Sequence, residues 1–173
     1  MDFFNQTGKL AIGSRLRMLT DKITVDAAAI YKMFGVDLKP KWFPVFFVLS
    51  RGEAKTITSI AKEIGHSHPS VSNIIKEMVA KGLVKETKDK SDGRRNMVML
   101  SAKGKRMSDS FSEQCIDVTA AIEQITQQTR NDLWEAIEEW ENLLLDKSLL
   151  ERVKEAKKER ESKDIKIVPY EPC

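Results

Sequence analysis

Side chains that can recognise nucleic acid recur on one face of a helix that is predicted to begin at Ser67. Apolar residues in this stretch are spaced three and four positions apart, which predicts a helix with one buried face. Hydroxyl, amide, imidazole and ammonium groups lie on the opposite face, and such groups bond to base edges and phosphates in a DNA major groove. The residues expected to face outward are Ser67, His68, Ser70, Ser72, Asn73, Lys76 and Glu77.

Three charged residues of a predicted hairpin loop form a second candidate DNA contact. The segments Leu83–Lys88 and Asn96–Ser101 alternate apolar and polar residues, which predicts two strands joined by a polar loop. Asp92, Arg94 and Arg95 lie in this loop. A planar, permanently charged guanidinium suits the narrow, electronegative minor groove of A·T-rich DNA. Either arginine could enter that groove, and the choice between them stays open.

Local signals predict the helices that position these side chains. A short helix is expected over Thr58–Ile64, and Gly65 ends it. The Ser67 hydroxyl can cap the next helix, Pro69 fits its first turn, and Gly82 ends it. The buried face of this second helix is expected to contain Val71, Ile74, Ile75 and Met78. Two helices followed by a hairpin with a basic tip predict a winged helix-turn-helix.

The net charge is concentrated on the same segment. Residues 55–106 hold 12 Lys and Arg against 5 Asp and Glu, an excess of 7 positive charges. The whole chain of 173 residues has a net charge of +3, so the remainder has a net charge of −4. Attraction to phosphates requires such a local excess. The excess argues against a winged helix that serves only protein–protein contacts.

Composition and motifs argue against several other functions. Cys115 and Cys173 lack metal-ligand spacing, and His66 and His68 have no further ligand nearby, so no metal or other cofactor is expected. The sequence contains no glycine-rich phosphate loop, nucleophile motif or paired catalytic carboxylates, so we do not expect an enzyme. The sequence also lacks a signal peptide, and no apolar run is long enough to span a membrane. Both observations favour the cytoplasm.

Amphipathic helices are predicted on both sides of the winged helix. Long ones cover residues 9–33, 102–126 and 131–145, and a short, nearly all-apolar helix covers residues 42–49. The terminal helices contain more apolar side chains than are needed to shield the core of one winged helix from water. We therefore expect these helices to pack against a second copy of the chain. Packing onto their own domain is the alternative. The candidate dimer contacts are Phe3, Phe4, Leu133, Trp134, Ile137 and Trp140.

The expected fold class is mainly α (α+β), a winged helix-turn-helix with long terminal dimerisation helices. We expect an N-terminal dimerisation helix over residues 1–38, the DNA-binding domain over 39–101, C-terminal dimerisation helices over 102–146, and a charged extension and tail over 147–173. Residues 146–164 are mostly charged, which predicts a fraying helical extension or a linker.

Three motifs follow one another in the order I-A-x-x-I-G-x-S-x-P-S-V-S-x-I-I-x-x-M-x-x-K-G-L-V, D-x-x-D-G-R-R and L-S-A-K-G. Their joint spacing resembles the MarR family of bacterial regulators, most clearly over residues 40–110. The resemblance implies a homodimer that binds double-stranded DNA at an inverted-repeat operator, usually as a repressor released by a small molecule or an oxidant. It also assigns one arginine of the hairpin loop to the minor groove, with Asp92 holding an arginine in place.

The same resemblance implies a ligand pocket between the first long helix, the short apolar helix and the helix after the hairpin. The aromatic residues that could line this pocket are Tyr31, Trp42, Phe46 and Phe47. Lys22, Arg15 or Arg17 could pair with an anionic group. Such residues suit a small aromatic or anionic effector. Plain packing of the aromatic side chains in the core is the alternative.

The end of the chain allows two interpretations. Residues 165–172 alternate like a strand and resemble the opening strand of a GNAT acetyltransferase domain. The chain would then be the regulatory front part of a bifunctional acetyltransferase, cut off near Cys173. A tail that packs locally is the other interpretation.

Overall fold

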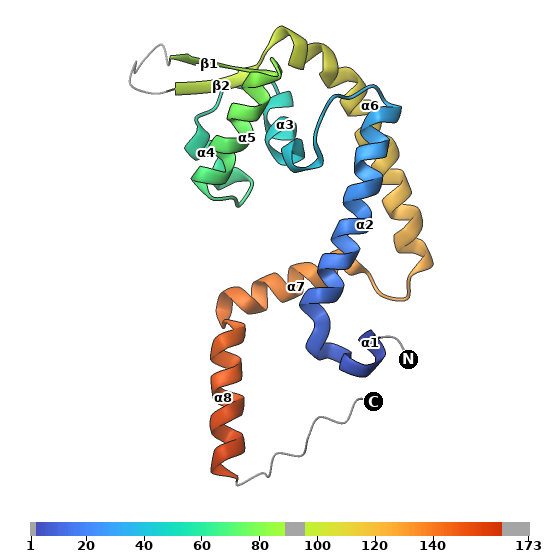
Figure 1. Ribbon diagram of the computed structural model, residues 1–173, viewed down its shortest axis with the longest axis vertical. Helices are drawn as coiled ribbons and strands as arrows, with labels where there is room; N and C mark the ends of the chain where they lie inside the picture. The colour runs from blue at the N-terminus through green and yellow to red at the C-terminus, as the bar shows by residue number, and fades with distance from the viewer. Residues whose placement is uncertain (1–2, 89–95, 164–173) are drawn as a thin grey trace. The chain divides into compact units, whose positions relative to one another are not determined.

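The computed structural model describes residues 3–88 and 96–163. This part of the chain is mostly helical and contains one antiparallel pair of strands (Figure 1). The chain forms two compact units, one of residues 17–118 and the other of residues 1–16 and 119–173. None of the described helices is long and apolar enough to cross a membrane.

The unit of residues 17–118 contains the predicted winged helix-turn-helix, which confirms the expected fold class. The short α4 and both strands begin and end within one residue of their predicted bounds. The elements of this module, in chain order, are η2 (Pro40–Trp42), α3 (Phe43–Ser50), α4 (Ile57–Glu63), α5 (His68–Ala80), β1 (Val84–Lys88) and β2 (Asn96–Leu100). The long helices α2 (Ile12–Met33) and α6 (Ala102–Gln128) precede and follow the module, and each contributes residues to both units.

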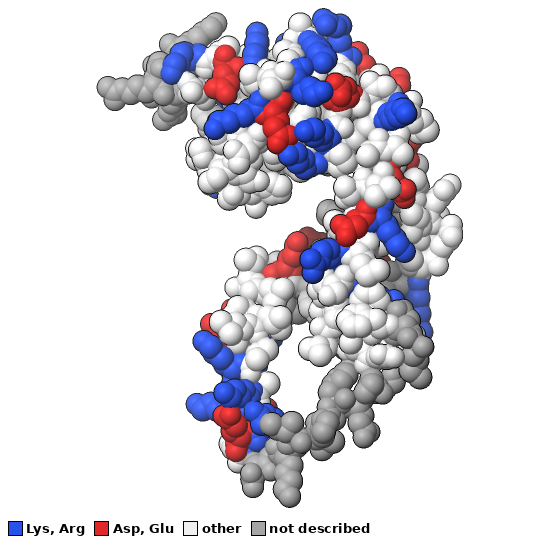
Figure 2. Space-filling view, in the orientation of Figure 1, with Lys and Arg blue, Asp and Glu red and all other residues white. Residues whose placement is uncertain are grey.

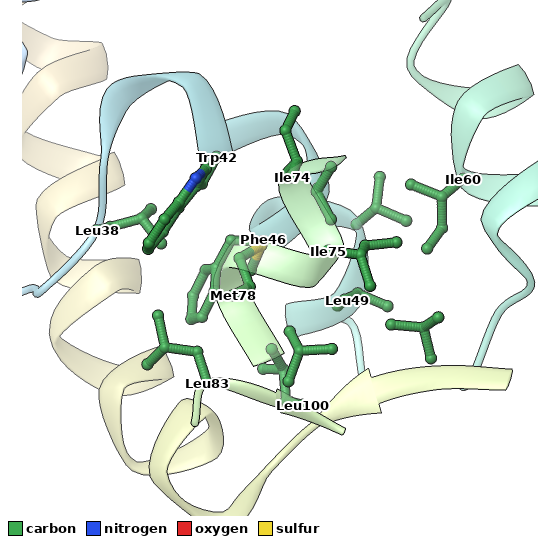
Figure 3. Close-up of a cluster of buried hydrophobic side chains, with 14 of the residues drawn as sticks. Leu38, Trp42, Phe46, Leu49, Ile60, Ile74, Ile75, Met78, Leu83 and Leu100 are labelled. Atoms are coloured by element: carbon green, nitrogen blue, oxygen red, sulfur yellow. The ribbon is translucent and has the colours of Figure 1, made fainter. Parts of the chain in front are cut away.

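Figure 3 shows the apolar core on which the module is built, where side chains of η2 and α3 meet those of α5 and the hairpin. Trp42, Phe46 and Leu49 are buried on one side of this core. The predicted inner face of α5 is buried completely, by Val71, Ile74, Ile75 and Met78. The core therefore fixes which side of α5 is turned away from the rest of the protein.

The predicted signals at the helix ends are present. The Ser67 hydroxyl accepts a hydrogen bond from the backbone N–H of Ser70 at 3.4 Å, and Thr56 caps α4 in the same way through Ser59. Gly82, which follows α5, has a φ of +71°. Only glycine adopts this backbone conformation without strain, so the chain can reverse here into β1.

The hairpin is tied to the start of α4 as well as to itself. Val84 pairs with Leu100 at one end of the two strands, and Lys88 pairs with Asn96 at the other. In addition, Lys55 exchanges two backbone hydrogen bonds with Val98, of 3.0 and 2.7 Å. The residues before α4 therefore extend the edge of the small sheet.

The L-S-A-K-G motif forms the junction between the hairpin and α6. The Ser101 hydroxyl donates to the Gly82 carbonyl at 2.5 Å and accepts from the Gly104 N–H at 3.1 Å. The Ser101 N–H donates to the Leu83 carbonyl at 2.9 Å. Gly104 is buried against that same carbonyl, where a side chain would not fit. The start of α6 is thus fixed to the segment that connects α5 with β1.

The other unit contains α1 (Phe3–Thr7), η1 (Gly8–Ala11), α7 (Leu133–Asp146) and α8 (Leu149–Ser162). Of the two alternatives predicted for residues 146–164, a fraying helical extension or a linker, the structure has the helix. It is regular, and a capping box formed by Ser148 and Glu151 begins it. The Arg152 guanidinium donates to the carbonyls of Leu143 and Lys147, at 2.8 and 3.1 Å. These bonds satisfy the last carbonyl groups of α7 and fix α8 to its end.

Two sequence-based predictions lie outside the described residues. They are the hairpin-loop residues Asp92, Arg94 and Arg95 and the strand over residues 165–172.

The close approach at Gly104 gives a stability prediction. Gly104→Ala should destabilise the protein by about 1–3 kcal/mol, the usual cost of forcing extra atoms into a packed site, because its methyl group would overlap the Leu83 carbonyl. Gly13→Ala is the matched control, since a Cβ on that α2 residue would meet nothing within 4 Å. The control should keep or gain stability in denaturant unfolding. Equal unfolding midpoints for the two variants would contradict the tight junction.

Candidate nucleic-acid interface

The outer face of α5 presents the polar groups that the sequence predicted for it. His68, Ser70, Asn73 and Lys76 are exposed, and the capping residue Ser67 is exposed at the start of the helix. Ser72 lies at the edge of this face and is half-buried. Hydroxyl, amide, imidazole and ammonium groups therefore lie together on one convex helix surface, which is the shape that a DNA major groove admits.

Glu77 was expected on the same open face, but three donors from a distant segment hold it. Its Oε1 accepts a hydrogen bond from Lys41 Nζ at 2.6 Å. Its Oε2 accepts from Trp42 Nε1 at 3.0 Å and from Lys39 Nζ at 3.2 Å. Glu77 therefore lies at the edge of the outer face and is a link between α5 and the segment of η2, which the sequence did not predict.

This network changes the acidity of the carboxyl group. Hydrogen bonds from Lys41, and then from Lys39 and Trp42, lower the pKa of Glu77 from 4.5 to about 2, although partial removal from water acts in the opposite direction. Glu77 is consequently ionised at neutral pH and in mild acid. Lys39 Nζ also lies 4.9 Å from the centroid of the Trp42 ring, within the range of cation–π contacts.

An open hollow of about 530 Å³ adjoins the start of α5. It is lined by Thr56, Ile57, Thr58, His68 and Asn96, which come from the ends of α4, α5 and β2. Hydroxyl, imidazole and amide groups are common contacts of phosphate and sugar in protein–DNA complexes. Of these residues only His68 was predicted as a candidate contact. The others were missed because a local sequence pattern does not show which residues meet across the turn.

Basic and acidic side chains lie next to each other over α3 and α5 in Figure 2, so the charge of this face is mixed rather than uniformly positive. An ion pair also joins α4 to the segment that precedes it, where Lys55 Nζ donates to Glu63 Oε2 at 2.8 Å, and this bond raises the pKa of Lys55. The net excess of 7 positive charges over residues 55–106 already counts such acidic partners, so the excess remains.

The residues predicted for an effector pocket include three buried aromatic side chains and two basic ones. Tyr31, Trp42 and Phe46 are buried in the core, with exposed fractions of 4%, 1% and 0%. Burial raises the pKa of Tyr31 to about 12, so its phenol group keeps its proton. Lys22 is exposed on α2. Arg15 belongs to the other unit, where its guanidinium lies 5.5 Å from the centroid of the Phe4 ring. The pocket itself stays a prediction.

The residues proposed for dimer contacts all belong to the unit of residues 1–16 and 119–173. Trp134 is 77% exposed, and Trp140 is 53% exposed. Leu133, Ile137 and Phe3 are also exposed, whereas Phe4 is half-buried and packs edge-on against the Phe3 ring. Their role in a dimer stays a prediction, although their exposure leaves them available for one.

Lys39 and Lys41 are the charged residues beside α5 that the sequence analysis missed. They precede Glu77 by 38 and 36 positions. Their local sequence, with Pro40 between them, indicates only the start of a helix. No spacing rule could place their ammonium groups against the second helix of the helix-turn-helix.

Residues 36–95 match the sequence profile of the MarR family, which confirms the resemblance found in the sequence. This span includes η2, α3, α4, α5 and β1. A comparison with curated proteins gives no match.

Several solved structures of transcriptional regulators share the fold. The transcriptional repressor CouR, bound to a 23-mer DNA duplex, is 20% identical with a TM-score of 0.60, and the alignment covers 80% of this chain and 96% of CouR. The PcaV transcriptional regulator from Streptomyces coelicolor, in complex with its natural ligand, is 13% identical with a TM-score of 0.58, covering 79% and 92%. A probable transcriptional regulator from Pseudomonas aeruginosa is 17% identical with a TM-score of 0.56, covering 77% and 96%.

The lowered pKa of Glu77 predicts how stability depends on pH. A carboxyl group whose pKa is lower in the folded than in the unfolded protein stabilises the fold above its unfolded pKa, and this contribution is lost as the group takes up a proton. Wild type should therefore lose stability relative to Glu77→Gln as the pH falls from 4.5 toward about 2. Thermal unfolding at several pH values measures the difference. Glu139→Gln on the exposed surface of α7 is the control, and parallel pH profiles for all three proteins would contradict the assignment.

Proposed function

We propose that this chain is a sequence-specific DNA-binding transcriptional regulator, on the premise that residues 36–95 are a MarR-family domain. The observation that carries the proposal is the exposed outer face of α5, which presents His68, Ser70, Asn73 and Lys76. The opposite face of α5 is buried in the core, so only the outer face is accessible to a partner. The excess of basic residues between positions 55 and 106 supports a polyanionic partner.

DNA would be read by α5 in the major groove. The Asn73 amide can form a bidentate pair of hydrogen bonds with N6 and N7 of adenine, and Lys76 can reach a guanine or a phosphate. The hollow beside His68 and Asn96 would receive the sugar–phosphate backbone as it passes between α5 and the hairpin. One of Arg94 and Arg95 would enter the minor groove, as predicted, and the choice between them stays open.

The protein would bind DNA as a homodimer. The exposed tryptophans of α7 are accompanied by Leu143, Leu144 and Leu145, which are 57%, 41% and 85% exposed. A soluble monomer rarely leaves so large an apolar surface in water. A second copy would cover this surface by a two-fold arrangement, and the paired α5 helices would then require an inverted-repeat operator.

The regulator would act as a repressor that a small effector releases. CouR is a repressor, and PcaV binds a natural ligand, which supports this mode of action for a chain with the same fold. A ligand lowers operator affinity only by its preference for the conformation that does not bind DNA.

An aromatic surface between α3 and α6 is the best-supported place for such an effector. The partly exposed rings of Phe43 and Phe47 pack against Phe111, with centroid distances of 5.8 and 6.5 Å. The Arg51 guanidinium lies 5.0 Å from the Phe47 centroid. Among the described residues, Gln114 Oε1 is a buried oxygen that lacks a hydrogen-bond partner. An aromatic anion would suit the rings and the Arg51 cation, and a hydroxyl or N–H donor on the same effector would suit the Gln114 oxygen.

The proposal predicts a defined operator and a specific role for Asn73. Selection of bound duplexes from a random pool should enrich an inverted repeat whose half-sites lie about 10 base pairs apart. Asn73→Ala should then lose about 1–3 kcal/mol of discrimination at one base position in each half-site, the cost of a bidentate base contact. Arg94→Ala should instead weaken binding to selected and scrambled DNA alike. Failure to enrich any sequence would overturn the proposed function. An unchanged ratio of selected to scrambled binding in Asn73→Ala would overturn the role of α5.

The assembly prediction concerns the apolar surface of α7. Wild type should have a dimeric mass in light scattering at micromolar concentration, and Trp140→Asp should shift the protein toward the monomer because it places a charge in the predicted interface. The same variant should bind operator DNA more weakly. Glu139→Gln, which also changes the charge of α7 by one unit, should remain dimeric. A monomeric wild type would contradict the proposed assembly.

A further inference from the structure

We propose that Lys39 and Lys41 form a DNA-phosphate contact beside α5, and that Glu77 is the positioning residue that holds them there. The inference rests on the proposed DNA-binding function. It adds a contact from the segment of η2, which belongs neither to the reading helix nor to the hairpin.

The position of Glu77 on α5 places the two ammonium groups next to the outer face of the helix. Glu77 follows Asn73 by four residues, and residues at this spacing lie on the same side of a helix, one turn apart. Lys41 and Lys39 reach Glu77 at 2.6 and 3.2 Å. A helix that enters the major groove with its first turns brings its later turns to the edge of the groove, where the phosphates lie.

Both lysines remain available to a second partner. Their side chains are 55% exposed although each is bonded to Glu77. An ammonium group has three N–H donors, and a single bond to a carboxylate leaves others for a phosphate oxygen. Two lysines against one carboxylate also leave one net positive charge at this place.

The surrounding contacts keep the pair ordered before any DNA binds. The Trp42 side chain is 1% exposed, and its Nε1 holds Glu77 Oε2 at 3.0 Å. Lys39 lies over the Trp42 ring, and Pro40 restricts the backbone between the two lysines. Lysine side chains usually lose considerable rotamer entropy when they are fixed. Ordering them in the free protein removes part of that cost from DNA binding.

A purely structural link between α5 and η2 is the competing explanation, and salt dependence separates the two. Each lysine that neutralises a phosphate releases counterions, so its loss lowers the slope of log affinity against log salt by about 0.9 in magnitude. A lysine that only stabilises the fold changes the melting temperature but leaves this slope unchanged.

The experiment measures binding by fluorescence anisotropy at several salt concentrations, with a labelled mixed-sequence duplex of about 30 base pairs, long enough for two half-sites one turn apart, and with the selected operator. The variants are Lys39→Gln, Lys41→Gln and their double. Lys158→Gln on α8 is the control, because it removes one exposed lysine from the other unit. Both single variants should flatten the salt slope by about 0.9 for each lost contact, equally on both DNAs, because phosphate contacts carry no base information. The control should keep the wild-type slope.

Glu77→Gln tests the positioning role. This variant keeps both lysines, so its salt slope should stay close to that of wild type. Its affinity for mixed-sequence DNA should rise, because a negative charge is lost. Its preference for the selected operator should fall, because lysines that are no longer held in place do not fix the register of α5 on the DNA. An unchanged preference would overturn the positioning role of Glu77.

The outcomes distinguish this inference from the proposed function. If wild type binds duplex DNA and the double lysine variant keeps its full salt slope, the phosphate contact is wrong and the DNA-binding function stands. A lowered melting temperature with that unchanged slope would establish the structural link instead. If wild type binds no duplex even at low salt, the proposed function itself fails, and the phosphate contact fails with it.

Discussion

The packing of α5 against η2 and α3 determines which of its side chains can meet another molecule. Val71, Ile75 and Met78 are completely buried, so the helix cannot rotate about its axis without bringing polar groups into the core. Such groups would lose their hydration without gaining partners there. The outer face is therefore fixed by the inner one. A major groove discriminates bases only when the reading side chains have a defined direction, and the apolar core supplies that direction.

Three polar connections extend this rigid core to the neighbouring elements. Glu77 joins α5 to η2, and Lys55 joins the start of α4 to the hairpin through Val98. Ser101 joins the segment between α5 and β1 to the start of α6. The elements cannot shift independently, because each shift would leave a polar group without its partner. An effector between α3 and α6 could thus change the placement of the hairpin and α5 together, which is the kind of coupling that the proposed regulation requires.

In the unit of residues 1–16 and 119–173, polar contacts order the helices while most apolar side chains stay exposed, unlike in the module around α5. Its helices α7 and α8 are joined by well-formed polar contacts, with Arg152 on the last carbonyls of α7 and Lys147 paired with Glu155. Their apolar side chains remain largely in solvent, and on α8 these include Leu149, Leu150 and Val153 at 62%, 62% and 56% exposure. Local hydrogen bonds can order these helices without covering them. The proposed dimer would provide the burial that one chain lacks.

The sequence by itself determined the features that depend on neighbouring residues. The cap at Ser67, the reversal at Gly82, the inner face of α5 and the alternation of the two strands follow from backbone preferences and from side-chain spacing within a few positions, and the structure has all of them. The same reasoning located the outward face of α5 and the exposed apolar surface of α7. The capping box of Ser148 and Glu151 is also a local pattern, S-x-x-E, but the prediction for residues 146–164 did not include it.

Only the tertiary structure decided which distant groups meet. The partners of Glu77 lie 35 to 38 residues away in the sequence, and the hollow at His68 is lined by the ends of three elements. The burial of Tyr31, Trp42 and Phe46 in the core was also decided by the tertiary structure. An aromatic side chain has the same local sequence pattern whether it lines a pocket or packs in the core. The physical reason is that periodicity defines a face of each helix, whereas the contacts of that face depend on how the chain returns to it through space.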